Sequence, residues 1–142
     1  MKISEVMTRS VETVSPDQTA KEAASFMLRA EAGSIPVCEN DRVIGMITDR
    51  DIAVRGVAEG LGPDARVRDL MSEGIICAHE DDDLDEVARR MSNEQVRRLP
   101  VLDSNERLVG IVSLGDLSRE TDGETAHHAL EGVSAPGGQH QQ

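Results

Sequence analysis

The sequence has 142 residues, enough for one domain or for two half-domains that share a core. Its 15 Lys and Arg against 27 Asp and Glu give a formal charge of −12, which argues against a general nucleic-acid binder and an anionic membrane surface because both need basic residues. No apolar run reaches the length of a membrane span, and Cys38 and Cys77 fit neither a redox nor a zinc motif, so we expect a cytoplasmic protein.

The first half of the chain predicts a short strand, a helix, a hairpin and a second helix. Residues 11–14 alternate apolar and polar, which predicts the strand. Thr19-Ala20-Lys21-Glu22 has the form of a capping box, and apolar residues at helical spacing follow it to about Glu31. Residues 35–48 predict the hairpin and residues 49–57 the second helix.

The second half predicts the same order of elements. After a turn at 67–71 and a strand at 75–78, Asp83 is placed to cap a helix that runs to about residue 93. A hairpin at 99–102 and 108–113 follows, and Asp116 is expected to start a last, short helix. Residues 121–142 have few apolar anchors and predict a disordered tail.

One octet occurs twice in the chain, as Gly-Met-Ile-Thr-Asp-Arg-Asp-Ile at 45–52 and Gly-Ile-Val-Ser-Leu-Gly-Asp-Leu at 110–117. Upstream of it, Met7 matches Met71 at a spacing of 64 residues. The repeat predicts two β-α-β-β-α halves, residues 1–58 and 67–120, joined by a linker at 59–66. Since neither half alone could bury much core, we expect the halves to pack together.

The octets, with Ile35-Pro36-Val37 and Leu99-Pro100-Val101, resemble the CBS (cystathionine β-synthase) domain, and two copies in tandem resemble a Bateman module. The resemblance covers about residues 3–118. It implies an α/β (α+β) fold of two pseudo-twofold-related β-α-β-β-α repeats packed through their sheets. It also implies a stand-alone pair, with no attached enzyme or channel.

The resemblance further implies two clefts between the repeats, each for an adenosine-containing ligand such as AMP, ADP, ATP or S-adenosylmethionine. Asp51 would hold both ribose hydroxyls, because one carboxylate accepts two O–H bonds, and Thr48 would donate to the α-phosphate. Ser113 and Asp116 would do the same in the other cleft. The adenine-facing residues would come from the opposite repeat: Ile75, Val96, Arg97, Arg98 and Pro100 for the Asp51 cleft, and Val11, Ala32, Ile35 and Pro36 for the Asp116 cleft.

The two clefts are expected to differ. Arg97 and Arg98 stand where the first repeat has Gly and Ser, and Arg50 of the first octet is replaced by Gly in the second. An Arg beside an anion site binds phosphate bidentately or is simply solvated. The first alternative makes the Asp51 cleft the more phosphate-friendly one.

Each hydroxyl–Asp pair also has a simpler interpretation as a helix cap, since Thr-x-x-Asp at a strand-to-helix junction is close to a capping box. No catalytic constellation or metal cluster stands out, so we predict no enzyme, no metal and no required cofactor. The main prediction is a homodimeric regulatory module that senses an adenosine-containing ligand. The alternatives are a ligand-free dimer that acts as a stress-response or protein-interaction module, and a regulator of a separate enzyme or transporter.

Overall fold

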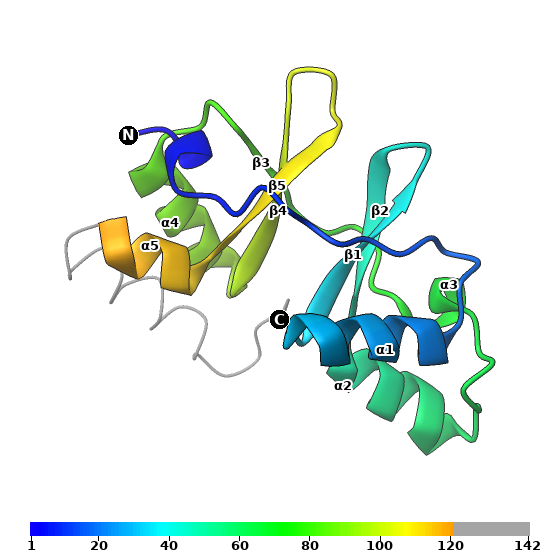
Figure 1. Ribbon diagram of the computed structural model, residues 1–142. Helices are drawn as coiled ribbons and strands as arrows, with labels where there is room; N and C mark the ends of the chain where they lie inside the picture. The colour runs from blue at the N-terminus through cyan, green and yellow to red at the C-terminus, as the bar shows by residue number, and fades with distance from the viewer. Residues whose placement is uncertain (121–142) are drawn as a thin grey trace. The chain divides into compact units, whose positions relative to one another are not determined.

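The computed structural model describes residues 1–120, so the tail predicted at 121–142 lies outside the described residues. The fold is a mixture of helices and short strands (Figure 1). In chain order the elements are η1 (Ile3–Glu5), α1 (Ala20–Ala30), β1 (Ser34–Glu39), β2 (Arg42–Thr48), α2 (Asp49–Asp51), η2 (Ile52–Gly56), η3 (Val57–Glu59), α3 (Val67–Leu70), β3 (Ala78–His79), α4 (Leu84–Glu94), β4 (Arg98–Leu102), β5 (Leu108–Ser113) and α5 (Leu114–Glu120). None of the helices in this part of the chain is long and apolar enough to cross a membrane.

The chain divides into two compact units whose limits differ from those of the sequence repeats. The inner unit is Glu12–Ile75, and among the described residues the terminal unit joins Met1–Val11 to residues 76–120. The inner unit contains the antiparallel hairpin β1–β2, and the terminal unit contains the matching hairpin β4–β5 with β3 parallel to β4. The first residues of the chain thus belong with the second repeat, and residues 67–75 belong with the first.

Two lead-in segments, residues 3–8 and 67–72, account for this exchange. Thr8 and Ile111 of β5 exchange two main-chain hydrogen bonds of 2.9 Å. Ser72 and Met46 of β2 do the same at 2.8 and 3.0 Å. Each hairpin therefore gains one short antiparallel contact from the lead-in segment of the other repeat, which satisfies main-chain groups at its edge.

The glycine that opens each octet allows this close crossing. A Cβ atom built on Gly45 would lie 2.6 Å from the carbonyl oxygen of Ser72. A Cβ atom on Gly110 would lie 2.6 Å from Met7 Sδ and 2.9 Å from the carbonyl oxygen of Thr8. These distances are too short for any other residue unless the lead-in segment moves, so the first position of the octet serves packing.

The core of the inner unit forms where α1 packs on its hairpin. The predicted capping box is confirmed, because Glu22 N donates to Thr19 Oγ1 at 3.2 Å and Thr19 N donates to Glu22 Oε1 at 3.4 Å. The buried residues recur at helical spacing along α1, and the others come from Val14 before it, the hairpin, α3 and the residue after α3: Val14, Ala20, Ala23, Met27, Ile35, Val37, Ile47, Val67, Leu70 and Met71. Burying one such large side chain stabilises the fold by about 1.5–3 kcal/mol.

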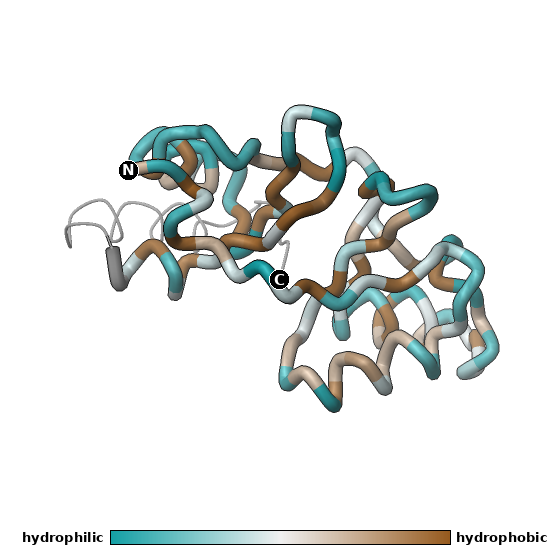
Figure 2. The backbone as a smooth tube through the Cα atoms, turned by 45° about the horizontal axis from the view of Figure 1, so that its top comes forward, coloured by the Kyte–Doolittle hydropathy of each residue, from teal (hydrophilic) through white to brown (hydrophobic). Residues whose placement is uncertain are grey.

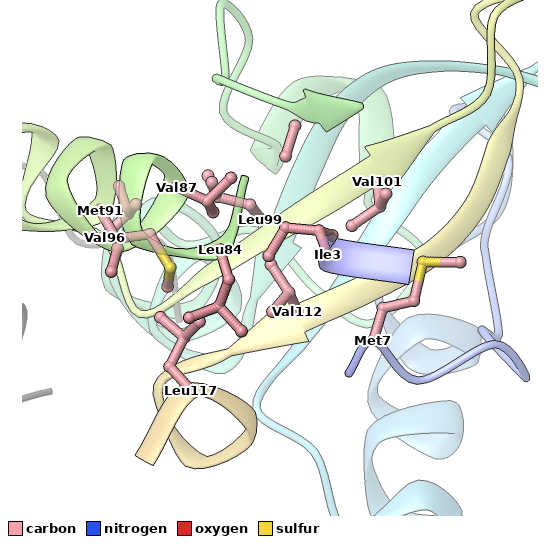
Figure 3. Packing of buried hydrophobic residues seen from close by; sticks show 12 residues of the cluster. Ile3, Met7, Leu84, Val87, Met91, Val96, Leu99, Val101, Val112 and Leu117 are labelled. Carbon is pink, nitrogen blue, oxygen red and sulfur yellow. The ribbon is translucent and has the colours of Figure 1, made fainter. Parts of the chain in front are cut away.

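The terminal unit has the equivalent core, with Asp83 as the cap of α4 through its bonds from the amides of Asp85 and Glu86. Figure 3 shows Ile3 and Met7, from the start of the chain, among side chains from α4, β4 and β5. The full cluster is Ile3, Met7, Ala78, Leu84, Val87, Ala88, Met91, Val96, Leu99, Val101, Val112 and Leu117. Figure 2 shows the hairpin β4–β5 with largely hydrophobic strands and a hydrophilic tip.

Three predicted elements differ from the structure. The strand at 11–14 is wrong, because only Val14 pairs, in a single parallel bridge with Val37. The strand at 75–78 is largely wrong, because β3 shares only Ala78 with it. The helix at 49–57 is divided into α2, the π-helical turn η2 and the 3₁₀ turn η3. Short segments were predicted least accurately, because two or three neighbouring residues cannot by themselves form a stable strand pairing.

Candidate functional site

The first candidate pair lies where β2 enters α2. Asp51 N donates to Thr48 Oγ1 at 3.0 Å, and Thr48 N donates to Asp51 Oδ2 at 3.0 Å. This is a reciprocal capping box, so the helix-cap interpretation of the pair is confirmed. Thr48 is buried, whereas the side chain of Asp51 keeps 13% of its surface exposed.

The second pair repeats this geometry where β5 enters α5. Asp116 N donates to Ser113 Oγ at 3.2 Å, and Ser113 N donates to Asp116 Oδ2 at 2.9 Å. The prediction that Asp116 starts the helix is wrong by two residues, because Ser113 takes the cap position and α5 begins at Leu114. Asp116 is buried, with 6% of its surface exposed.

Within each unit, the segment that leads into the hairpin lies beside the strand-to-helix corner. Asp49 N donates to the carbonyl oxygen of Gly33 at 3.0 Å, and Leu114 N donates to that of Arg97 at 3.1 Å. The structure therefore groups the candidate residues by unit. The inner unit holds Thr48, Arg50, Asp51, Ala32, Ile35, Pro36 and Ile75. The terminal unit holds Ser113, Asp116, Val11, Val96, Arg97, Arg98 and Pro100. The crosswise pairing between repeats stays a prediction.

The two corners carry different charges. In the inner unit, a Cβ atom on Gly33 would lie 3.0 Å from Asp49 Oδ2, so an additional carboxylate stands at this corner. In the terminal unit the equivalent positions are Arg97 and Leu114, so a cation replaces glycine and an apolar side chain replaces the carboxylate. The prediction from sequence overlooked Asp49, although its place beside the hydroxyl residue of the octet was a usable signal.

Arg55 is a second residue that the sequence prediction overlooked. Its Nε lies 3.8 Å from Asp51 Oδ1, and its Nη1 donates to the carbonyl oxygen of Met71 at 3.0 Å. The spacing of four residues between Asp51 and Arg55 was the available signal, since such residues are neighbours on a helix. The contact with Met71 had no signal in the local sequence.

The thiol of Cys77, in the terminal unit, is not a reactive group at neutral pH. Burial raises the pKa of Cys77 to about 11, and Arg90 offsets only part of that rise. A protonated thiol is a poor nucleophile and a poor metal ligand. Among the described residues, no three His, Cys, Asp or Glu side chains are grouped to hold a metal ion.

Comparison with known proteins explains the duplicated corners. A family model for the CBS domain matches residues 3–56 and 67–123. The chain belongs to the CBS-domain family. Both the predicted resemblance and the predicted α/β fold of two CBS repeats are confirmed by this match.

Three CBS proteins illustrate the relationship. The CBS domain-containing protein YhcV of Bacillus subtilis is 42% identical over 133 residues, covering 93% of this chain and 94% of its own. Hypoxic response protein 1 of Mycobacterium tuberculosis is 34% identical over 93% of both chains. A crystal structure of hypoxic response protein I, with two coordinated zinc ions, has a TM-score of 0.78 and covers 85% of this chain and 99% of that one.

The third protein, also a solved structure, is the CBS domain pair of protein MJ0100, in complex with 5′-methylthioadenosine and S-adenosyl-L-methionine. It is 28% identical, with a TM-score of 0.74, and the alignment covers 84% of this chain and 94% of that one.

Proposed function

We propose that this CBS pair is a cytoplasmic regulatory module that binds an adenosine-containing ligand through its two strand-to-helix corners. The observation that carries the proposal is the same geometry in both units, a hydroxyl residue and an Asp carboxylate held by reciprocal hydrogen bonds. The adenosine compounds in the complex of the MJ0100 pair support this class of ligand. The proposal gives the protein the role of a regulator rather than an enzyme.

The cap and the ligand role are chemically compatible. In the cap, Asp51 Oδ2 accepts one main-chain N–H, and an ionised carboxylate has about four lone-pair sites in all. Two vicinal ribose hydroxyls therefore find acceptors on the same group. Thr48 Oγ1 acts as an acceptor in the cap, which leaves its O–H to donate to an anionic group of the ligand.

The charges of the corners suggest which ligand each one prefers. The pairing across repeats predicts phosphate at the Asp51 corner, because it places Arg97 and Arg98 there. The grouping within units instead favours phosphate at the Asp116 corner, because Asp49 adds a negative charge beside Asp51. Like charges close together disfavour an anion, so the two alternatives predict opposite preferences for AMP.

Thermal unfolding of the full chain with millimolar AMP or S-adenosylmethionine tests the proposal. A ligand at about 100 times its dissociation constant adds about 2.7 kcal/mol, which raises the Tm of a chain this size by several degrees. We expect such a rise with at least one compound, and a loss of it in Asp51→Asn or Asp116→Asn. The variant that loses the AMP response identifies the phosphate corner. No rise with either compound would contradict the proposal.

A second candidate function, a ligand-free homodimer for protein interaction, is favoured by apolar side chains on the inner unit. Leu28 of α1 is 80% exposed and Val57 of η3 is 69% exposed. Because the chain carries a charge of −12, association of two copies needs apolar contact to offset repulsion. Analytical ultracentrifugation should show a dimer that Leu28→Glu with Val57→Glu converts to a monomer, while Thr13→Glu, at an exposed site, leaves it intact. A dimer that survives the double change would exclude this surface.

A further inference from the structure

Arg55 lies between the Asp51 carboxylate and the lead-in segment of the second repeat. Its Nε is 3.8 Å from Asp51 Oδ1. Its Nη1 donates to the carbonyl oxygens of Leu70 at 3.4 Å and Met71 at 3.0 Å. Those carbonyls belong to the end of α3 and the residue after it, where a helix leaves main-chain acceptors without partners.

A continuous path of contacts returns from Met71 to the candidate site. Ser72, the next residue, exchanges two main-chain hydrogen bonds with Met46 of β2. The strand β2 ends at Thr48, which caps α2 together with Asp51. Arg55 therefore completes a ring of contacts that joins Asp51, the lead-in segment and β2.

The terminal unit differs in sequence and helix type at the equivalent position. Glu120 occupies the position equivalent to Arg55, four residues after the Asp of the octet. The helix there is α-helical from Leu114 to Glu120, whereas Arg55 lies in the π-helical turn η2, from Ile52 to Gly56. Single π turns are frequent at functional sites because they redirect side chains.

We propose that Arg55 positions the Asp51 carboxylate and couples ligand binding at this corner to residues 70–73, the end of the lead-in segment and the residue after it. The inference rests on the proposed function for its ligand and on the contacts of Arg55 for its path. A guanidinium serves this purpose because its planar fork donates to several acceptors in fixed directions. Asp51 is thereby the regulated corner.

The first experiment uses no ligand. Hydrogen–deuterium exchange is measured on the full chain for residues 70–73 in the unaltered protein, Asp51→Asn, Arg55→Ala and the double variant. We expect both single changes to speed exchange by about threefold to fivefold, the range for a partly exposed ion pair with supporting hydrogen bonds. The double variant should be no faster than Arg55→Ala. Additive effects of the two changes would overturn the coupling.

The second experiment adds the ligand. In an Asp116→Asn background, saturating S-adenosylmethionine or AMP should slow exchange at residues 70–73. Arg55→Ala should weaken binding by about fivefold and remove this slowing even at saturation. Arg55→Lys should recover part of the affinity because it keeps a cation near Asp51. Arg42→Ala, which removes an equal charge from an exposed site of the same unit, should behave like the background protein.

The outcomes separate the two proposals. If Arg55→Ala retains the slowing at saturation, the inference is wrong and the proposed function stands. If neither compound binds while the ligand-free coupling is found, the proposed function is wrong and the path through Arg55 stands. Retained exchange rates in α1 would show that Arg55→Ala leaves the inner unit folded.

Discussion

The cap role of Asp51 and Asp116 is compatible with the ligand role that we propose for them. In each, a carboxylate oxygen accepts the main-chain N–H of the residue three positions earlier, at 3.0 and 2.9 Å. The rotamer is therefore fixed on folding, and a ligand need not immobilise it, a saving of about 0.5–1.5 kcal/mol. The cap interpretation and the ligand interpretation, which looked like alternatives in the sequence, reinforce one another.

Cys77 supports a prediction about pH. Burial raises the pKa of its thiol to about 11, against about 9 for an unperturbed thiol. Between these pH values the unfolded chain binds fewer protons than the folded one, so the free energy of unfolding should fall as pH rises from about 9 to 11. Urea unfolding at several pH values should show this fall in the unaltered protein, and a smaller one in Cys77→Ala.

Alkylation gives an independent check of the same thiol. In a Cys38→Ser background, iodoacetamide should modify Cys77 slowly at pH 8 and faster up to about pH 11, because only the thiolate reacts. Reaction at pH 8 as fast as in the urea-unfolded chain would contradict the raised pKa.

At the scale of elements, the sequence predicted the contacts between residues that are close together in the chain. The capping box of Thr19 and Glu22 and the pairs Thr48–Asp51 and Ser113–Asp116 all join residues three apart, so spacing alone identified them. The lead-in segments, in contrast, pair residues far apart in the sequence, Thr8 with Ile111 and Ser72 with Met46. No spacing rule distinguishes these pairings from pairings within one repeat, because both repeats offer the same edge. The contact of Arg55 with Met71 escaped prediction for the same reason.

The crossings over Gly45 and Gly110 predict unequal costs for the same substitution. In Gly45→Ala the new Cβ meets a main-chain oxygen at 2.6 Å, so the lead-in segment must move as a whole. In Gly110→Ala the nearest atom, at 2.6 Å, is the flexible end of Met7, although the Thr8 oxygen at 2.9 Å still limits the adjustment. We expect both to lower the free energy of unfolding, by about 1–3 kcal/mol, with the larger loss in Gly45→Ala.

Urea unfolding measures both losses against Gly62→Ala, where a new Cβ meets nothing within 4 Å. That control should change stability little. Equal stability in Gly45→Ala and Gly62→Ala would show that the lead-in segment can move away from Gly45 at little cost.

At the scale of the whole molecule, the exchange of lead-in segments makes each compact unit depend on both repeats. Ile3 and Met7 are 0% and 8% exposed in the core of the terminal unit, and Val67 and Leu70 are fully buried in that of the inner unit. A repeat excised at its sequence limits would lose one set of core residues and carry another with no core to enter. The folding unit of this chain is therefore the pair of repeats.

Removal of residues 1–9 tests this view directly. The deletion takes Ile3 and Met7 out of the terminal core, and losing two large buried side chains costs about 4 kcal/mol or more. Hydrogen exchange should therefore rise in α4 and β5, which are distant in sequence, and stay slow in α1, whose unit contains none of the deleted residues. If the deletion instead exposed α1 and spared α4, the compact units would follow the sequence repeats. Ile3→Ala should show the same pattern more weakly, because it removes one of the two side chains and keeps the main-chain contact of Thr8 with Ile111.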